Sequence, residues 1–292
     1  MFTGTASYAQ QDAQFTQYMY NTINVNPAYA GSRDVMSAFV LHRAQWIGID
    51  GAPVTNAVSI NAPIKGSDIG MGISLINDKL GPTQENTFSA DLSYTINTSE
   101  TFKLSFGVKA TANLFNLDAT KLNPENANDA NLQNYNKFTP NIGAGVYLHS
   151  NKAYVGFSVP NFIESQSYND NDVAINKEKI HYYLIAGYVF DMSDSVKFKP
   201  ALLTKMVQGS PLQVDLSGNF LINEKFTAGI AYRWSAAMSA LVGFQANESW
   251  FIGYGYDLET TKLANYNSGT HEIFLRYELF KKYDQIISPR FF

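Results

Sequence analysis

The side chains of this chain that could carry chemistry are charged residues at alternate positions of polar, strand-like segments. Asp91, Lys103 and Lys109 are examples, and acidic and basic residues are mixed along these faces. Mixed charges favour structural ion pairs across an interior over a one-sign ring that would select ions. The candidate residues for such an interior are Arg43, Trp46, Asp91, Lys103, Lys109, Asp215, Arg233, Glu272 and Arg276, with Glu278 on the same kind of face.

The sequence shows no recognisable motif for catalysis or metal binding beside these charged residues. The four histidines lie in different segments, and none stands beside a nucleophile with a recognisable spacing. The Asn-rich run 123–131 lacks the ligand spacing of a calcium loop. Glycine pairs at 70–72 and 143–145 lie inside strand-like segments, where a phosphate loop does not fit. We therefore predict no enzyme activity, no cofactor and no metal site.

Composition narrows the class of protein further. The 292 residues show no linker-like shift and are read as one large β domain. Charged residues are only 16% and the net charge is −4, so we expect no nucleic-acid partner. No apolar run reaches the roughly 18 residues of a membrane helix. The absence of cysteine excludes a disulfide scaffold and a thiol-ligated metal.

The elements that must position the charges are long alternating strands. Around Lys103 and Lys109 the intervening positions are apolar, namely Phe102, Leu104, Phe106, Val108, Ala110, Ala112 and Leu114. Such segments, at about ten to fifteen residues, exceed the usual strands of soluble sheets and suit tilted membrane strands. Aromatic rings at their ends favour the lipid interface. The sequence predicts an all-β protein, a single transmembrane antiparallel up-and-down β-barrel of about 14 strands in contact with outer-membrane lipid.

The spacing of these segments predicts the topology. The expected strands are 34–47, 53–62, 68–79, 85–98, 101–115, 138–149, 152–160, 180–191, 195–207, 211–223, 225–234, 238–247, 250–259 and 269–279. Long polar connections, Asn116–Lys137 and Asn161–Lys179, fall only between an odd-numbered strand and the next. An even strand count places both termini in the periplasm and these long loops outside the cell.

The two ends of the chain do not alternate. Residues 1–9 resemble the small-residue end of a signal peptide, a remnant ahead of a leader at 10–32, the barrel at 33–280 and a periplasmic tail at 281–292. The apolar mass of the leader needs cover, so we expect it to plug the lower lumen or to contact a periplasmic partner. Its candidate residues are Gln14, Phe15, Tyr18, Met19, Asn26, Pro27, Tyr29 and Gly31, and those for tail docking are Pro289, Arg290, Phe291 and Phe292.

Several short motifs recur in order along the chain. They are Gln14-Phe15-Thr16-Gln17-Tyr18-Met19, Asn26-Pro27-Ala28-Tyr29-Ala30-Gly31-Ser32, Arg43-Ala44-Gln45-Trp46-Ile47-Gly48, Gly51-Ala52-Pro53-Val54-Thr55, Asn77-Asp78-Lys79-Leu80-Gly81-Pro82-Thr83 and Ser288-Pro289-Arg290-Phe291-Phe292. Together they resemble the PorP/SprF family of the type IX secretion and gliding apparatus of the Bacteroidetes.

The resemblance implies an outer-membrane barrel that works by binding. It would help to export or anchor surface proteins such as gliding adhesins, including those with a type B C-terminal domain. The implied partners are that secreted surface protein and periplasmic or lipoprotein type IX components. Two alternatives stay open at this stage, a passive porin for small solutes and a soluble β protein with binding or carbohydrate activity.

Overall fold

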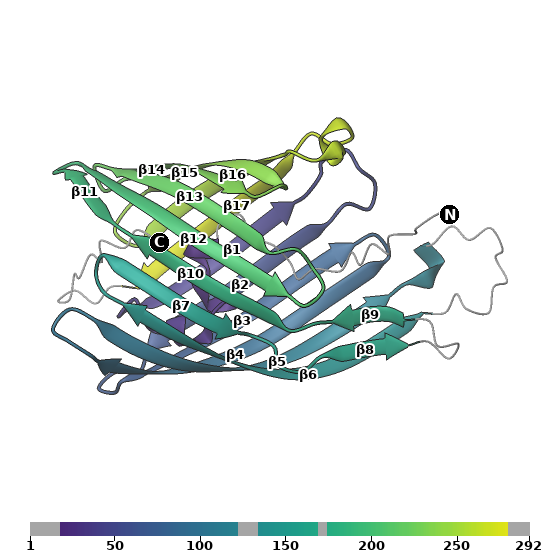
Figure 1. The fold of residues 1–292 in the computed structure, drawn as a ribbon, viewed down its shortest axis with the longest axis horizontal. Helices are drawn as coiled ribbons and strands as arrows, with labels where there is room; N and C mark the ends of the chain where they lie inside the picture. The colour runs from purple at the N-terminus through teal and green to yellow at the C-terminus, as the bar shows by residue number, and fades with distance from the viewer. Residues whose placement is uncertain (1–17, 122–133, 169–173, 280–292) are drawn as a thin grey trace.

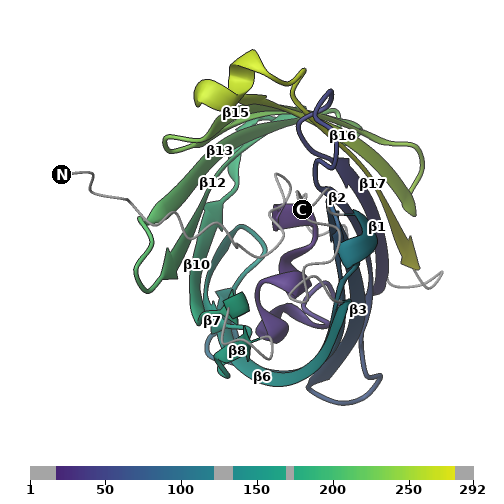
Figure 2. The same cartoon turned by 90° about the vertical axis from the view of Figure 1, so that its right-hand side faces the viewer.

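The computed structural model describes residues 18–121, 134–168 and 174–279. Its main sheet is antiparallel and closes on itself through the β10–β12 pairing, as Figures 1 and 2 show. Strands β10 and β11 form one wall strand, so the described barrel has fourteen, as predicted. The wall strands are β1 (Met36–Ala44), β2 (Val54–Pro63), β3 (Ile69–Leu80), β4 (Thr83–Asn97), β5 (Lys103–Leu117), β6 (Tyr135–His149), β7 (Ala153–Val159), β10 (His181–Tyr188), β11 (Phe190–Ser193), β12 (Val196–Val207), β13 (Gln213–Ile222), β14 (Phe226–Arg233), β15 (Ala237–Gln245), β16 (Trp250–Glu259) and β17 (Thr270–Leu279).

Alternation along the strands decides which side chains face outward. In β5, Phe106 and Val108 are 48% and 57% exposed on the outer face, whereas Ser105 and Lys109 between them are buried. This is the two-residue period of a strand, with an apolar face for lipid and a polar face for the interior. Aromatic rings also lie at both ends of the outer face, as Trp234 and Trp250 illustrate. The predicted assignment of the two faces is therefore confirmed in this part of the barrel.

The two ends of the barrel differ in their connections. One end, called here the short-turn end, holds turns 64–68, 98–102, 150–152, 194–195, 223–225 and 246–249, together with the start of β1 and the end of β17. The other, called the long-loop end, holds connections 45–53, 81–82, 118–134, 160–180, 208–212, 234–236 and 260–269. The longest connections therefore all lie at one end, which is the asymmetry that the sequence predicts.

Three details differ from the predicted segments. The first strand ends at Ala44, because the next turn brings Trp46 to a φ of 47°, a left-handed value that no strand accommodates. The segment predicted as 180–191 is interrupted at Val189, whose N–H donates to the carbonyl of Lys152 at 2.7 Å. The connection predicted as a plain polar loop contains a small hairpin of β8 (Ser165–Tyr168) and β9 (Ala174–Glu178).

Helical structure in the described residues is limited to short 3-10 turns. Three of them follow one another in the leader, as η1 (Tyr18–Tyr20), η2 (Thr22–Asn24) and η3 (Pro27–Tyr29). The other two are η4 (Ala119–Lys121) and η5 (Lys262–Asn265), in connections at the long-loop end. Within the described ranges, no helix has the length and apolar character needed to cross a membrane.

Candidate functional site

The leader, from Tyr18 to Ser32, lies inside the barrel. Figure 2 looks along the barrel and shows its 3-10 turns enclosed by the wall. Its residues form the centre of the buried core with inward side chains from both halves of the wall. The leader members of that core are Tyr18, Met19, Tyr20, Ile23, Val25, Ala28, Tyr29 and Ala30. Inward-facing side chains of the wall therefore bury the apolar side chains of the leader.

The local fold of the leader follows from Asn26 and its neighbours. Asn26 is extended because a residue before proline is driven out of the helical region. Its Oδ1 accepts a hydrogen bond from the Ala28 N–H at 3.0 Å, and Pro27 begins the turn, where the missing N–H costs no bond. Gly31, at a φ of 70°, then turns the chain toward β1.

The polar inner wall supplies partners for the backbone of the leader. Ser93 donates to the carbonyl of Ala30 at 2.7 Å, and Ser158 donates to the carbonyl of Val25 at 2.8 Å. The Lys109 ammonium donates to the carbonyl of Ile23 at 3.2 Å. Buried carbonyls need such partners, and irregular turns leave many of them unpaired within the chain. The wall therefore binds the leader through hydrogen bonds as well as through apolar packing.

Asn26 also bonds directly to the wall. Its Nδ2 donates to the carbonyl of Val146 at 3.0 Å, while Oδ1 remains engaged by Ala28. One side chain thus caps its own turn and holds that turn against β6. This double use explains why an amide is suited to the position.

Four inward glycines let the leader approach the wall closely. A Cβ at Gly107 would lie 2.1 Å from the backbone nitrogen of Ala28, and one at Gly70 would lie 2.1 Å from the carbonyl oxygen of Ala30. These distances are far below contact, and both obstacles are backbone atoms that cannot rotate away. The glycine groove, as we call it, consists of Gly70, Gly72, Gly107 and Gly145.

Aromatic contacts also join the leader to strands β16 and β17. The Tyr20 ring lies 5.3 Å from that of Phe251 and 4.8 Å from that of Phe274, measured between centroids. The Arg276 guanidinium and the Lys199 ammonium lie within 6 Å of the same ring, a cation–π distance. Burial raises the pKa of Tyr20 to about 12 although the Arg276 charge opposes this shift, so the phenol is neutral at physiological pH.

The predicted interior charges do lie on the inner face, and most are paired. Lys109 lies 3.0 Å from Asp91, and Arg233 lies 2.9 Å from Asp215. In each pair the two residues are direct neighbours on adjacent strands. The prediction of pairing across the lumen was therefore wrong for these residues, because partners one strand away are closer than any across the barrel.

Arg43 is the centre of the most deeply buried charged group. Its guanidinium contacts Asp257 at 2.7 Å and Glu272 at 3.0 Å, and all three side chains are at most 3% exposed. Glu272 is the register partner of Arg43, whereas Asp257 lies one strand further along. Burying a charge costs several kcal/mol unless a partner balances it, so these contacts are mutually required.

Two of the predicted interior residues lie at the margins of the barrel. Lys103 is at the short-turn end, where its partly exposed ammonium pairs with Asp34 at 3.3 Å. Trp46 lies beyond β1 in connection 45–53, where its indole N–H donates to Glu259 at 2.9 Å. The prediction that Trp46 faces the lumen was wrong, because β1 ends at Ala44 and the turn that follows takes Trp46 out of the strand.

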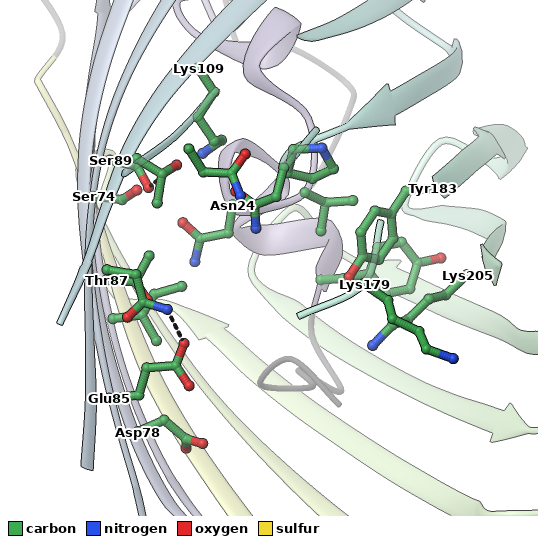
Figure 3. A pocket seen from close by; sticks show the side chains of 18 of the residues that line it. Asn24, Ser74, Asp78, Glu85, Thr87, Ser89, Lys109, Lys179, Tyr183 and Lys205 are labelled. Atoms are coloured by element: carbon green, nitrogen blue, oxygen red, sulfur yellow. Dashed lines mark hydrogen bonds between the residues drawn. The ribbon is translucent and has the colours of Figure 1, made fainter. Parts of the chain in front are cut away.

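A cavity remains between the leader and the long-loop end, and we call it the vestibule. Tyr18, Asn24 and Val25 of the leader line its floor. Figure 3 shows polar side chains converging on it from several strands. Its wall and rim are lined by Ser74, Ile76, Asp78, Glu85, Thr87, Ser89, Lys109, Thr111, Asn113, Thr139, Asn141, Pro160, Asn161, Lys179, Tyr183, Leu203, Lys205, Gln213, Asp215 and Arg233.

Several contributors to this site were not among the sequence candidates. Tyr20, Ile23 and the glycine groove were missed, although glycines recurring at inward strand positions were a usable signal. Gln14, Phe15, the segment 1–9 and the tail candidates Pro289, Arg290, Phe291 and Phe292 lie outside the described residues. In the part of the chain that is described, no group of three or more His, Asp or Glu side chains could hold a metal ion.

Comparison with known proteins agrees with this architecture. A family model described as type IX secretion system membrane protein PorP/SprF matches residues 7–277. A search of curated proteins found no match. A FadL homologue from Pseudomonas aeruginosa has a similar structure, with a TM-score of 0.50 at 12% identity over 90% of this chain and 94% of that one. The CymD monoaromatic hydrocarbon channel also has a TM-score of 0.50, at 11% identity over 91% and 94% of the two chains. These likenesses concern the barrel fold.

Proposed function

This chain belongs to the PorP/SprF family of type IX secretion system membrane proteins and is an outer-membrane β-barrel, and from that premise we propose that it works by binding. In this proposal it holds secreted surface proteins, those with a type B C-terminal domain, during export or at the cell surface. It performs no catalytic step. The long-loop end faces outward, so β1 begins and β17 ends on the periplasmic side.

The leader in the lumen is the observation that supports this proposal best. A solute path needs a continuous polar channel, but the leader fills the mid-barrel with apolar side chains from Tyr20 to Ala30. The inner charges nearest to it, such as Lys109 and Asp91, are engaged with each other. A barrel occupied in this way is better suited to holding a protein at one end than to conducting solutes.

Co-purification from native outer membranes tests the binding role. Tagged protein extracted in detergent should enrich secreted surface proteins with type B C-terminal domains, identified by mass spectrometry, together with periplasmic or lipoprotein type IX components. An unrelated tagged barrel of similar abundance serves as the control. Equal recovery of those proteins with both barrels would contradict the proposal.

A passive porin for small solutes is the second candidate, favoured by the polar vestibule that opens toward the long-loop end. The two functions differ in what loss of the protein does to the cell. A porin predicts slower uptake of small solutes with surface proteins retained. The binding role predicts loss of surface proteins with unchanged solute uptake.

A further inference from the structure

The long-loop half of β6 has a partner strand on one side only. Its pairing with β5 covers all 15 residues, from Tyr135 to His149, whereas its pairing with β7 covers only Ala144–His149. In Figure 1, β6 continues past the end of β7 toward the long-loop end. One edge of β6 is therefore open beyond β7 in the described part of the chain.

The chain that follows β7 runs along this edge for a few residues and then leaves it. The Phe162 N–H donates to the carbonyl of Ile142 at 2.8 Å. The Asn141 amide donates to the carbonyl of Ile163 at 2.8 Å and accepts from the Ile163 N–H at 2.9 Å. The hairpin of β8 and β9 that comes next forms a sheet of its own. No described strand pairs with this side of residues 135–140, which we call the open edge.

The open edge presents main-chain hydrogen-bonding groups. The carbonyl of Ile142 points away from β5, since it accepts from Phe162. Successive residues of a strand point their N–H and C=O groups to opposite sides, so Pro140, Phe138 and Asn136 point the same way as Ile142. Proline has no N–H to donate and is found in strands that lack a neighbour on that side, and Pro140 fits this rule.

Strand length places the open edge outside the lipid. A membrane strand needs about 9–11 residues, whereas β4, β5 and β6 each have 15. Unpaired main-chain groups are not tolerated in hydrocarbon, so the open edge stands beyond the lipid, on the outer side in the proposed orientation. The side chain of Phe138 is 59% exposed there.

We propose that an extended segment of the secreted surface protein pairs with the open edge and adds a strand to the wall. This inference rests on the proposed binding function and adds the place and the chemistry of the contact. A strand edge repeats donors and acceptors at the spacing of a polypeptide main chain, and a saccharide or a small solute does not match that spacing. Because Thr139 and Asn141 line the vestibule, alternate side chains of the added strand point into that cavity, and the others lie beside Phe138.

Site-specific photocrosslinking in cells tests the location. A photoreactive phenylalanine analogue replaces Phe138 or, as the control, Phe88, which is 47% exposed on the outer face of β4. The register places Phe88 level with Pro140 and two strands away from the open edge. We expect adducts to one segment of the secreted surface protein at position 138 and at least tenfold fewer at position 88. Equal adducts at both positions, or adducts at 138 only to the β8–β9 hairpin or to a second copy of this chain, would overturn the proposal.

Proline substitution tests the chemistry. Phe138→Pro removes the N–H on the open edge and places the proline ring where the added strand approaches, while the bonds to β5 stay intact. Phe138→Ala removes the same aromatic ring and keeps the N–H, so it is the matched control. Recovery of the co-purified surface protein should fall at least tenfold in Phe138→Pro and less than threefold in Phe138→Ala. Heat-modifiable gel migration verifies that each barrel has folded, and Asn136→Pro makes the same change at the next position of the edge if Phe138→Pro does not fold.

The outcomes separate the two levels of inference. Equal recovery of surface protein with Phe138→Pro and Phe138→Ala would mean that main-chain pairing is not used, and it would reject the open edge alone. Absence of any enriched surface protein with the wild-type barrel would reject the binding function itself.

Discussion

At the scale of single residues, charged side chains on the inner wall form ion pairs with oppositely charged side chains nearby. Arg43 shows the consequence, since its guanidinium contacts the carboxylates of both Asp257 and Glu272 in the buried interior of the wall. A pair of this kind need not contribute much net stability when intact. Removing one partner is costly, because the remaining charge stays buried.

We therefore expect Arg43→Ala to lower the free energy of unfolding by about 3–5 kcal/mol. Urea unfolding in detergent, followed by tryptophan fluorescence, measures this change. Lys152→Ala is the control, because Lys152 pairs with Asp191 at 2.5 Å on the exposed surface. Indistinguishable unfolding curves for the two variants would show that the Arg43 group is not structural.

The glycine groove makes a second prediction at this scale. In Gly107→Val, the new side chain would occupy the position of the Ala28 backbone, so the leader must move away from β5. Hydrogen–deuterium exchange of the leader amides should rise at least tenfold. Ala110→Val places the same side chain on the outer face of the same strand and should leave exchange unchanged. Protected leader amides in Gly107→Val would mean that the groove is not needed for docking.

At the scale of elements, the leader and the connections give the barrel two different ends. The leader reaches from the vestibule floor at Tyr18 to the short-turn end, where Arg33 pairs with Glu278 of β17. The long connections lie at the opposite end. Membrane barrels have short periplasmic turns and longer external loops, so this asymmetry predicts the orientation.

Single cysteines test the orientation cleanly, because the chain has no cysteine of its own. A cysteine at Asn134 or Phe162, in the long connections, should react with an impermeant maleimide on intact cells. A cysteine at Ser150 or Asn223, in short turns, should react only after the outer membrane is opened. The reverse pattern would invert the topology.

At the scale of the whole molecule, the strand period of two was sufficient to predict the fold. Each wall strand has to present apolar side chains to lipid on one face and polar side chains to the interior on the other. The exposed Phe106 and Val108 and the buried Lys109 of β5 show this alternation. The lengths of the predicted connections then indicated an up-and-down topology with the long loops at one end of the barrel. A closed barrel is the arrangement that leaves no unpaired strand edge in lipid.

The candidate site was harder to predict from the sequence than the fold, for a physical reason. Irregular turns have no period, so the path of the leader depends on which wall positions are glycine and which carry donors such as Ser93 and Ser158. Charge partners depend on register, and a shift of one residue would move every charge to the other face. The sequence could therefore name Arg43, Lys109 and Asp215 as interior residues without naming their partners.

Conductance of the purified barrel in a planar bilayer tests the central claim, that the leader closes the lumen. We expect the wild-type protein to show no steady open level. A variant with Tyr18→Ser, Tyr20→Ser and Tyr29→Ser should open frequently, because it loses the rings that pack the leader against the walls, including the contacts of Tyr20 with Phe251 and Phe274. A wide and steady conductance from the wild-type barrel would contradict the account.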